Sequence, residues 1–224
     1  MKKILLLLML MGICFSAQAH QFADSLAFKQ AKLKNLKLPL SASLYKEDSY
    51  GNTLVFQYAL KGDVQAISSL KDVAGNVKDR GAFLLRVDTK TGNNVFHVAK
   101  DVQTIQALAR LLRVYYPVSY GRKIRQMMNH RNYALETPVH RQINYGRSDS
   151  FRATFSYTEL YDRIIKVKTK LDRGGLVAET ALSEVEEILL QSKDSSGRTI
   201  AQAAKANNMT EIVDFFNKNA PYLL

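Results

Sequence analysis

The feature that most constrains the fold is a short recurring pattern, in which a turn residue is followed by a polar helix start and an apolar stripe. Its fullest form is the run Glu136-Thr137-Pro138-Val139-His140. Thr137 can cap a helix with its hydroxyl, and Pro138 suits the first helical position, where a missing amide hydrogen is no loss. Val139 then points inward and His140 stays within the first turn. We therefore expect a helix to begin at Pro138.

The same pattern occurs in four copies, each followed at matching offsets by a second apolar stripe. The helix starts lie in residues 51–55, 92–99, 136–140 and 197–204. The second stripes contain Ala66, Ile67 and Leu70; Leu108, Leu111 and Leu112; Phe151 and Phe155, after a break at Gly146; and Ile212, Val213 and Phe216. Each copy thus predicts a helix, a tight turn and a second helix.

This arrangement resembles the ankyrin repeat, whose signature is a turn glycine, Thr-Pro-Leu-His-x-Ala and a following Val/Leu stripe. The resemblance covers residues 48–70, 88–112, 132–155 and 194–217, less than half the chain. It implies structural roles for Gly51, Thr53, Gly92, His97, Thr137, Pro138, His140, Gly197 and Thr199.

The copies depart from that signature in three ways. Leu135 occupies the turn position in the third copy, where a positive φ would be strained. Only the third copy keeps Thr-Pro, and only the second and third keep the histidine; Phe56 and Gln202 replace it elsewhere. The turn positions are 41, 43 and 62 residues apart, against about 33 in the usual repeat. These departures indicate degenerate repeats with long insertions.

The predicted fold is all-α, an ankyrin-like solenoid of stacked helix-turn-helix repeats with insertions over residues 48–217. Residues 20–47 are expected to form an N-terminal capping helix, because a repeat stack must cover its exposed apolar end. Residues 156–193 form a helical insertion, interpreted as a helix pair joined at Gly174-Gly175 that has lost its turn. Residues 218–224 are a C-terminal tail whose apolar end folds back on the last pair.

The N-terminus predicts export. Lys2 and Lys3 precede an apolar run and the small-residue sequence Ala17-Gln18-Ala19, which is typical of a signal peptide over residues 1–19 with cleavage before His20. The apolar run is short for a membrane span of about 20 residues. Cleavage removes Cys14, the only cysteine. We expect a periplasmic or secreted protein without disulfides.

No catalytic, cofactor or metal constellation is found in the sequence. His97 and His140 fall at the repeat's own histidine position, and His130 has no nearby cysteine or closely spaced acidic partner. A glycine-rich phosphate loop is missing, because Asp172-Arg173-Gly174-Gly175 lacks the Gly-Lys-Ser/Thr end. We therefore predict that the protein is not an enzyme and carries neither cofactor nor metal.

Charge is the remaining functional signal. The net charge of +12 becomes +10 once Lys2 and Lys3 leave, and residues 113–152 hold eight basic residues against Glu136 and Asp149. Such a span can steer an acidic protein partner. An anionic membrane surface is a weaker alternative, and nucleic acid is not expected for an exported protein. The further alternative, that the charge only keeps the domain soluble, is equally open.

These observations predict a monomeric, non-catalytic scaffold that binds another protein. Ankyrin-like proteins generally bind through their turns and the concave face of the first helices, which places contact residues at the turns, with the basic span added. The predicted contact residues are Tyr50, Asn52, Lys90, Asn93, Arg122, Lys123, Arg125, Arg131, Tyr133 and Arg198. Two alternatives stay open: a periplasmic immunity or enzyme-protecting partner, and a secreted effector that engages a host target.

Overall fold

The computed structural model describes residues 44–72, 81–173, 184–185, 187–189 and 193–224. All of them belong to one compact unit, Leu40–Leu224. Regular structure in these residues is helical, apart from an isolated antiparallel bridge between Lys193 and Thr199. The all-α prediction is therefore confirmed. The signal peptide, residues 20–43 of the expected capping helix and the Gly174-Gly175 junction lie outside the described residues.

Four helix pairs follow the four copies of the sequence pattern within the described residues. Their bounds are α3 (Leu54–Lys61) and α4 (Val64–Ser69); α6 (Val95–Val98) and α7 (Val102–Tyr115); α9 (Pro138–Asn144) and α10 (Ser148–Phe155); α13 (Ile200–Ala206) and α14 (Thr210–Asn219). Gly62 and Gly146, at the breaks inside the first and third pairs, have φ of +75° and +65°. Both helices of every predicted copy are therefore present.

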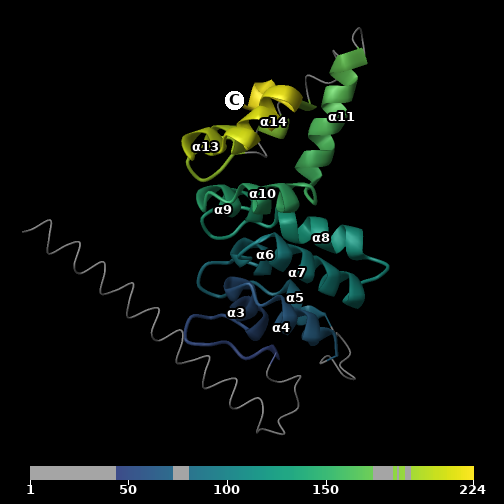
Figure 1. Ribbon diagram of the computed structural model, residues 1–224, viewed down its shortest axis with the longest axis vertical. Helices are drawn as coiled ribbons and strands as arrows, with labels where there is room; N and C mark the ends of the chain where they lie inside the picture. The colour runs from purple at the N-terminus through teal and green to yellow at the C-terminus, as the bar shows by residue number, and fades with distance from the viewer. Residues whose placement is uncertain (1–43, 73–80, 174–183, 186, 190–192) are drawn as a thin grey trace, which may run out of the picture. The chain divides into compact units, whose positions relative to one another are not determined.

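The pairs stack in chain order (Figure 1). The first helices form one row, in which α3 packs on α6, α6 on α9 and α9 on α13. In the second row α4 packs on α7 and α7 on α10. Each pair therefore buries its apolar stripes against the pair before or after it, which no single pair could do alone.

The core between the rows is built from the predicted stripes. Phe56, Ile67 and Phe96 are fully or almost fully buried in the first half. In the second half, the ring of Phe155 lies 5.1 Å from that of Phe151 and 5.8 Å from that of Phe216, measured between centroids. These rings join α10 to α14, although the two helices are separated by the insertion.

Additional helices occupy the connections between pairs. They are η1 (Leu70–Asp72) and α5 (Ala82–Leu85) after the first pair, α8 (Tyr120–Asn129) after the second, and α11 (Glu159–Arg173) after the third. Residues 184–185 and 187–189 are also helical. The earlier residue of α11, Arg163, pairs with the later residue of this segment, Glu187, whereas the later Lys170 pairs with the earlier Glu184. The segment therefore lies antiparallel to α11.

The C-terminal residues pack on the last pair. Helix α14 ends at Asn219, two residues beyond the predicted repeat, and η2 (Pro221–Leu223) contacts both α13 and α14. Leu223 is fully buried, and its carbonyl oxygen accepts a hydrogen bond from the Thr199 hydroxyl. The expectation that the apolar end folds back is confirmed. No described helix is both long enough and apolar enough to cross a membrane.

Candidate protein-interaction surface

A tight turn with one shared backbone arrangement precedes the first helix of each pair. In the first, third and fourth turns an Asp or Asn N–H donates to the carbonyl oxygen four residues later: Asp48 to Asn52 at 3.0 Å, Asn132 to Glu136 at 2.9 Å and Asp194 to Arg198 at 2.8 Å. The second turn is one residue longer, and Asp88 donates to Asn93 at 2.8 Å. We call these segments, residues 48–52, 88–93, 132–136 and 194–198, the turn row.

The side chain of the first residue holds each turn closed. Asp194 Oδ1 accepts from the backbone N–H of Ser196 at 2.8 Å and of Arg198 at 3.0 Å. Asn132 Oδ1 does the same for Ala134 and Glu136, at 3.0 and 2.9 Å. Burial opposes ionisation of Asp194, but the hydrogen bonds from Arg198 and Ser196 outweigh it and lower the pKa of this carboxyl. The turns are thus rigid rather than extended loops.

Sequence reasoning missed these Asp and Asn residues, although a signal was present. Asp48, Asn132 and Asp194 each stand three residues before the turn residue, and Asp88 stands four before it. Such side chains bond backbone N–H groups a few residues on and so favour turns. The ankyrin-like resemblance depends on the turn glycines and does not include these Asp and Asn residues.

The turn position itself requires a left-handed backbone in all four copies. Gly51, Gly92 and Gly197 have φ of +81°, +70° and +75°, and Leu135 has φ of +59°. The expected strain at Leu135 is therefore real, because a side chain at this φ meets the backbone. Its side chain is 55% exposed, so no core packing offsets the cost.

Capping boxes follow the turns in the last three copies. The pairs are Asn94 with His97, Thr137 with His140, and Thr199 with Gln202. His140 Nδ1 lies 3.3 Å from the Thr137 N–H, and Gln202 Oε1 accepts from the Thr199 N–H at 3.0 Å. The histidine position is therefore a helix-capping position, which supports the structural roles expected for His97 and His140. In the first copy Thr53 makes no such hydrogen bond.

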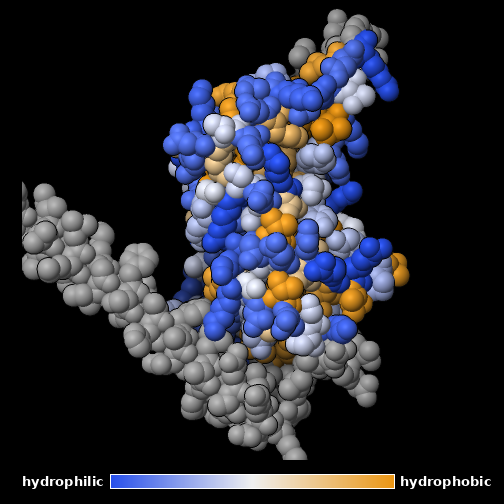
Figure 2. Space-filling model, in the orientation of Figure 1, coloured by the Kyte–Doolittle hydropathy of each residue, from blue (hydrophilic) through white to orange (hydrophobic). Residues whose placement is uncertain are grey.

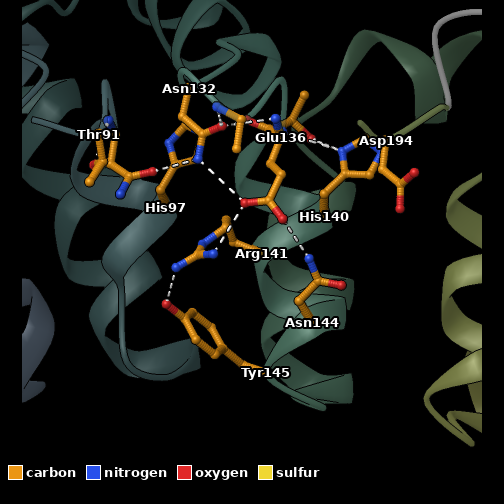
Figure 3. Close-up of polar contacts among 12 residues, drawn as sticks. Thr91, His97, Asn132, Glu136, His140, Arg141, Asn144, Tyr145 and Asp194 are labelled. Atoms are coloured by element: carbon orange, nitrogen blue, oxygen red, sulfur yellow. Dashed lines mark hydrogen bonds and ion pairs between the residues drawn. The ribbon is translucent and has the colours of Figure 1, made fainter. Parts of the chain in front are cut away.

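His97 also links two copies. It is fully buried, and its Nε2 donates to the backbone carbonyl oxygen of Glu136 at 3.0 Å, while Nδ1 accepts from the Asn94 N–H at 3.2 Å (Figure 3). Burial lowers the pKa of His97 from 6.5 to about 3, because desolvation disfavours the imidazolium. The ring is thus uncharged at neutral pH, and its two hydrogen bonds stabilise the fold.

His130 has no potential side-chain partner nearby in the sequence, but the fold brings it into contact with the second copy. Its Nε2 donates to the Gly92 carbonyl oxygen at 2.9 Å, and its ring packs edge-on against that of His97, 5.8 Å between centroids. No cluster of three or more His, Cys, Asp or Glu side chains that could bind a metal is formed by the residues that the structure describes.

Glu136 anchors the third turn to α9 (Figure 3). Its carboxylate accepts from Arg141 Nη1 at 3.1 Å and from Asn144 Nδ2 at 2.6 Å. Arg141 in turn donates to the hydroxyl of Tyr145. The nearly buried carboxylate is therefore paired within the protein, as a buried charge requires.

Neighbouring turns contact one another. Lys90 Nζ donates to the Ser49 carbonyl oxygen at 2.5 Å and lies 5.6 Å from the centroid of the Tyr50 ring. The Tyr133 N–H donates to the Thr91 carbonyl oxygen at 2.9 Å. Arg131, which directly precedes the third turn, donates to the carbonyl oxygen of Lys193 at 3.1 Å. The turn row is therefore one continuous surface across all four pairs.

The structure separates the predicted contact residues into three groups. Turn-row side chains that solvent reaches are Tyr50, Asn52, Lys90, Tyr133 and Arg198, with Arg131 exposed directly beside the row. Tyr133 is 68% exposed. Asn93 is only 7% exposed and accepts from Asn132 Nδ2 at 2.9 Å, so we exclude it from the contact set. Arg122, Lys123 and Arg125 lie on α8, outside the row.

The basic residues of the span 113–152 are spread over several elements of the fold. They lie on α7, α8, α9 and α10, except for Arg131, directly before the third turn, and Arg147, directly before α10. Arg125 pairs with Asp162 at 3.3 Å, Arg141 with Glu136, and Arg152 with Glu211 at 2.9 Å. Arg147 donates to the Ala99 carbonyl oxygen at 3.0 Å. Several of these charges are thus paired within the fold, so the net charge of the span overstates its charge at the surface.

A cavity of about 190 Å³ lies beside the third turn, between residues of α8, α9, α11 and α13. Met128, Val139, Leu160 and Ile200 give it apolar walls, and His140 lies among its polar lining. The Thr137 hydroxyl is 2.7 Å from His140 Nδ1, the same nitrogen that the Thr137 N–H contacts in the capping box. The cavity is thus small and lined by residues that already serve the fold.

Comparisons with known proteins found no matching family model, no matching curated protein and no matching solved structure.

Proposed function

We propose that this chain is an exported, non-catalytic scaffold of ankyrin-like repeats that binds another protein through the turn row. The observation that carries the proposal is the continuity of the row: four similar turns, the second one residue longer, are joined to one another and have solvent-exposed side chains at their tips. A pre-organised surface loses little conformational freedom on binding, which favours affinity.

The composition of the row favours an acidic partner. Lys90, Arg131 and Lys193 are exposed at or beside the turns. The aspartates of the row, by contrast, turn their carboxylates toward backbone N–H groups of their own turns. Tyr133 adds an exposed aromatic ring, a residue type enriched in protein interfaces. Positive charge beside an aromatic contact suits a protein segment rich in Asp and Glu.

Site-specific photo-crosslinking in the native host tests this proposal. A photoreactive phenylalanine at position 133 or 90 should yield one discrete adduct, whose protein is then identified by mass spectrometry. The same residue at Gln106, an exposed position of α7 outside the row, is the matched control. The proposal is overturned if positions 133 and 90 yield no adduct, or only the adducts that position 106 yields.

Affinity for the identified partner gives a second test. Lys90→Glu should weaken binding at least tenfold, because a charge opposite to the partner's is replaced by a like charge. Lys205→Glu makes the same change in net charge at an exposed position of α13. Equal losses in the two variants would mean that net charge, not the turn row, controls binding.

The expectation of export is tested separately. The mature protein should begin at His20, which N-terminal sequencing of material from the periplasm or the medium reads directly. An N-terminus at Met1 in the cytoplasm would contradict the exported location and leave the turn row as a binding surface in another compartment.

A further inference from the structure

The connection between α7 and α8 exposes apolar side chains outside the turn row. Helix α7 ends at Tyr115 and α8 begins at Tyr120. Val118 is 100% exposed and Val114 is 57% exposed, and Pro117 between them is also exposed. We call these three residues the apolar tip. Single exposed apolar residues are common on protein surfaces, but here three lie within five positions, at the α7–α8 connection that projects from the side of the stack (Figure 1).

The apolar tip is held in place by the two tyrosines beside it. The Tyr115 hydroxyl donates to the Leu70 carbonyl oxygen at 2.5 Å, and its ring packs edge-on against Phe83 at 5.5 Å between centroids. The Tyr116 ring lies so close to Gly81 that a Cβ there would stand 2.4 Å from a ring carbon. The aromatic rings are therefore turned into the fold, and the aliphatic residues are left outside.

Basic residues surround the apolar tip. Arg110 and Arg113 are exposed on the last turns of α7, and Arg122 is exposed at the start of α8. The Arg113 guanidinium lies 5.9 Å from the centroid of the Tyr120 ring. Lys123 Nζ lies 5.6 Å from that of Tyr116. These aromatic contacts hold both cations at the base of the tip.

Acidic residues are missing from this part of the sequence, which has none between Asp101 and Glu136. Asp162 of α11 pairs with Arg125 at 3.3 Å, but both side chains are about half exposed, so the pair is weak. Figure 2 shows hydrophobic and hydrophilic residues side by side at this end of the molecule. The surface thus combines the exposed apolar tip with a basic surround, formed by Arg110, Arg113, Arg122 and Lys123.

We propose that the apolar tip and its basic surround dock on an anionic phospholipid bilayer. The aliphatic side chains enter the boundary between headgroups and acyl chains, and the arginines bind lipid phosphates around them. Charge complementarity and the aliphatic chemistry of the tip select this partner. A protein groove would favour aromatic or arginine anchors at its centre, whereas the half-buried rings of Tyr115 and Tyr116 pack on the fold behind the tip. This inference does not depend on the turn row.

Vesicle sedimentation tests the inference with the exported form of the protein. Binding is expected to vesicles of phosphatidylcholine with 30% phosphatidylglycerol (roughly the anionic content at which surface attraction is strong) and not to pure phosphatidylcholine. The double variant Val114→Ser/Val118→Ser should reduce binding about tenfold, because it removes aliphatic burial. Leu60→Ser, at an exposed position of α3, is the matched control and should change little.

Two charge-reversal variants distinguish attraction by the basic residues around the tip from attraction by the net charge of the protein. Arg122→Glu should weaken vesicle binding about tenfold, whereas Lys205→Glu, with the same change in net charge, should weaken it far less. Equal loss of vesicle binding in the two variants overturns the inference, because the net charge of the protein would then explain the binding. Vesicle binding that survives Val114→Ser/Val118→Ser overturns it as well, because the aliphatic side chains would then not contribute.

The depth to which the apolar tip enters the bilayer can be measured with a single introduced tryptophan, since the chain has none of its own. Val118→Trp should show a blue shift and quenching by brominated acyl chains when anionic vesicles are added, and Leu60→Trp should show neither. An emission spectrum of the Val118→Trp variant that stays unchanged while the protein sediments with vesicles would overturn the inference. Failure of all vesicle binding would overturn it too, and would leave the turn-row proposal untouched.

Discussion

The imidazole Nε2 of His97 lies 3.0 Å from the backbone carbonyl oxygen of Glu136, so the first helix of the second pair is bonded directly to the third turn. The same ring accepts from the Asn94 N–H through Nδ1. One neutral side chain therefore caps its own helix and fixes the position of the next copy.

Replacement of His97 should destabilise the fold in a graded way. His97→Ala leaves the buried Asn94 N–H unpaired and removes one of the two hydrogen bonds to the Glu136 carbonyl oxygen, which keeps that from the Asn132 N–H. This should lower the free energy of unfolding by about 2 kcal/mol. His97→Gln should cost less, because Gln202 performs the capping half of this role in the fourth copy. Urea denaturation measures both variants. A loss below about 0.5 kcal/mol for His97→Ala, the range of ordinary surface changes, would refute the bridging role.

Stability should fall as the pH is lowered through the acid range, and His97 should account for part of the fall. Its pKa is about 3 in the folded protein and about 6.5 when unfolded, so the unfolded state binds the proton first. The stabilisation is fully present above pH 6.5 and is lost progressively toward pH 3. Between pH 7.5 and 4.5 this loss is on the order of 2 kcal/mol.

The test of that pH dependence is a comparison with His97→Gln, which cannot titrate in this range. The difference in unfolding free energy between the wild type and this variant should shrink by that amount from pH 7.5 to 4.5. A difference that stays constant would show that His97 is not held neutral by burial.

Leu135→Gly should stabilise the protein by about 0.5–1 kcal/mol. Leu135 has a φ of +59° with an exposed side chain, so glycine removes the backbone strain and loses little packing. Thermal unfolding measures the gain. Leu135→Ala is the control, because it removes the side chain but keeps the strain, and it should bring no comparable gain. If both variants are less stable than the wild type, the side chain contributes packing that outweighs the strain.

Two glycines of the turn row should respond differently to a methyl group. A Cβ at Gly197 meets nothing within 4 Å, so Gly197→Ala should cost only the conformational term of about 1 kcal/mol. A Cβ at Gly92 would stand 2.7 Å from a carbon of the Tyr133 ring, so Gly92→Ala must also displace that ring and should cost clearly more. Chemical denaturation of the two variants checks the order. Equal costs would mean that Tyr133 moves away freely and that the contact between the second and third turns is weak.

Much of the fold could be predicted because its signals are local. The capping residues, the proline at the start of α9 and the apolar stripes at helical spacing act within one turn or one helix. The pattern also places Leu135 at the turn position, where a positive φ is strained, and the structure shows a φ of +59° there. The Asp and Asn residues that close the turns carry the same kind of local signal, because such side chains bond backbone N–H groups a few residues on.

The candidate site was predicted less well, because access and pairing depend on contacts between distant residues. Asn93 is buried by Asn132, 39 residues away, and Arg152 pairs with Glu211, 59 residues away. His130 reaches Gly92 across 38 residues. No pattern in the neighbouring sequence reports such contacts.

The sequence by itself determined where helices begin and turn, because caps, left-handed turn residues and apolar periodicity are short-range effects. Only the tertiary structure decided which polar side chains remain exposed to solvent. Stacking brings the four turns into contact, places neutral His97 between two copies and turns Tyr115 and Tyr116 inward, so that Val118 stays exposed. The physical reason is that burial and hydrogen-bond pairing are properties of the packed stack, whereas helix initiation is a property of a few consecutive residues.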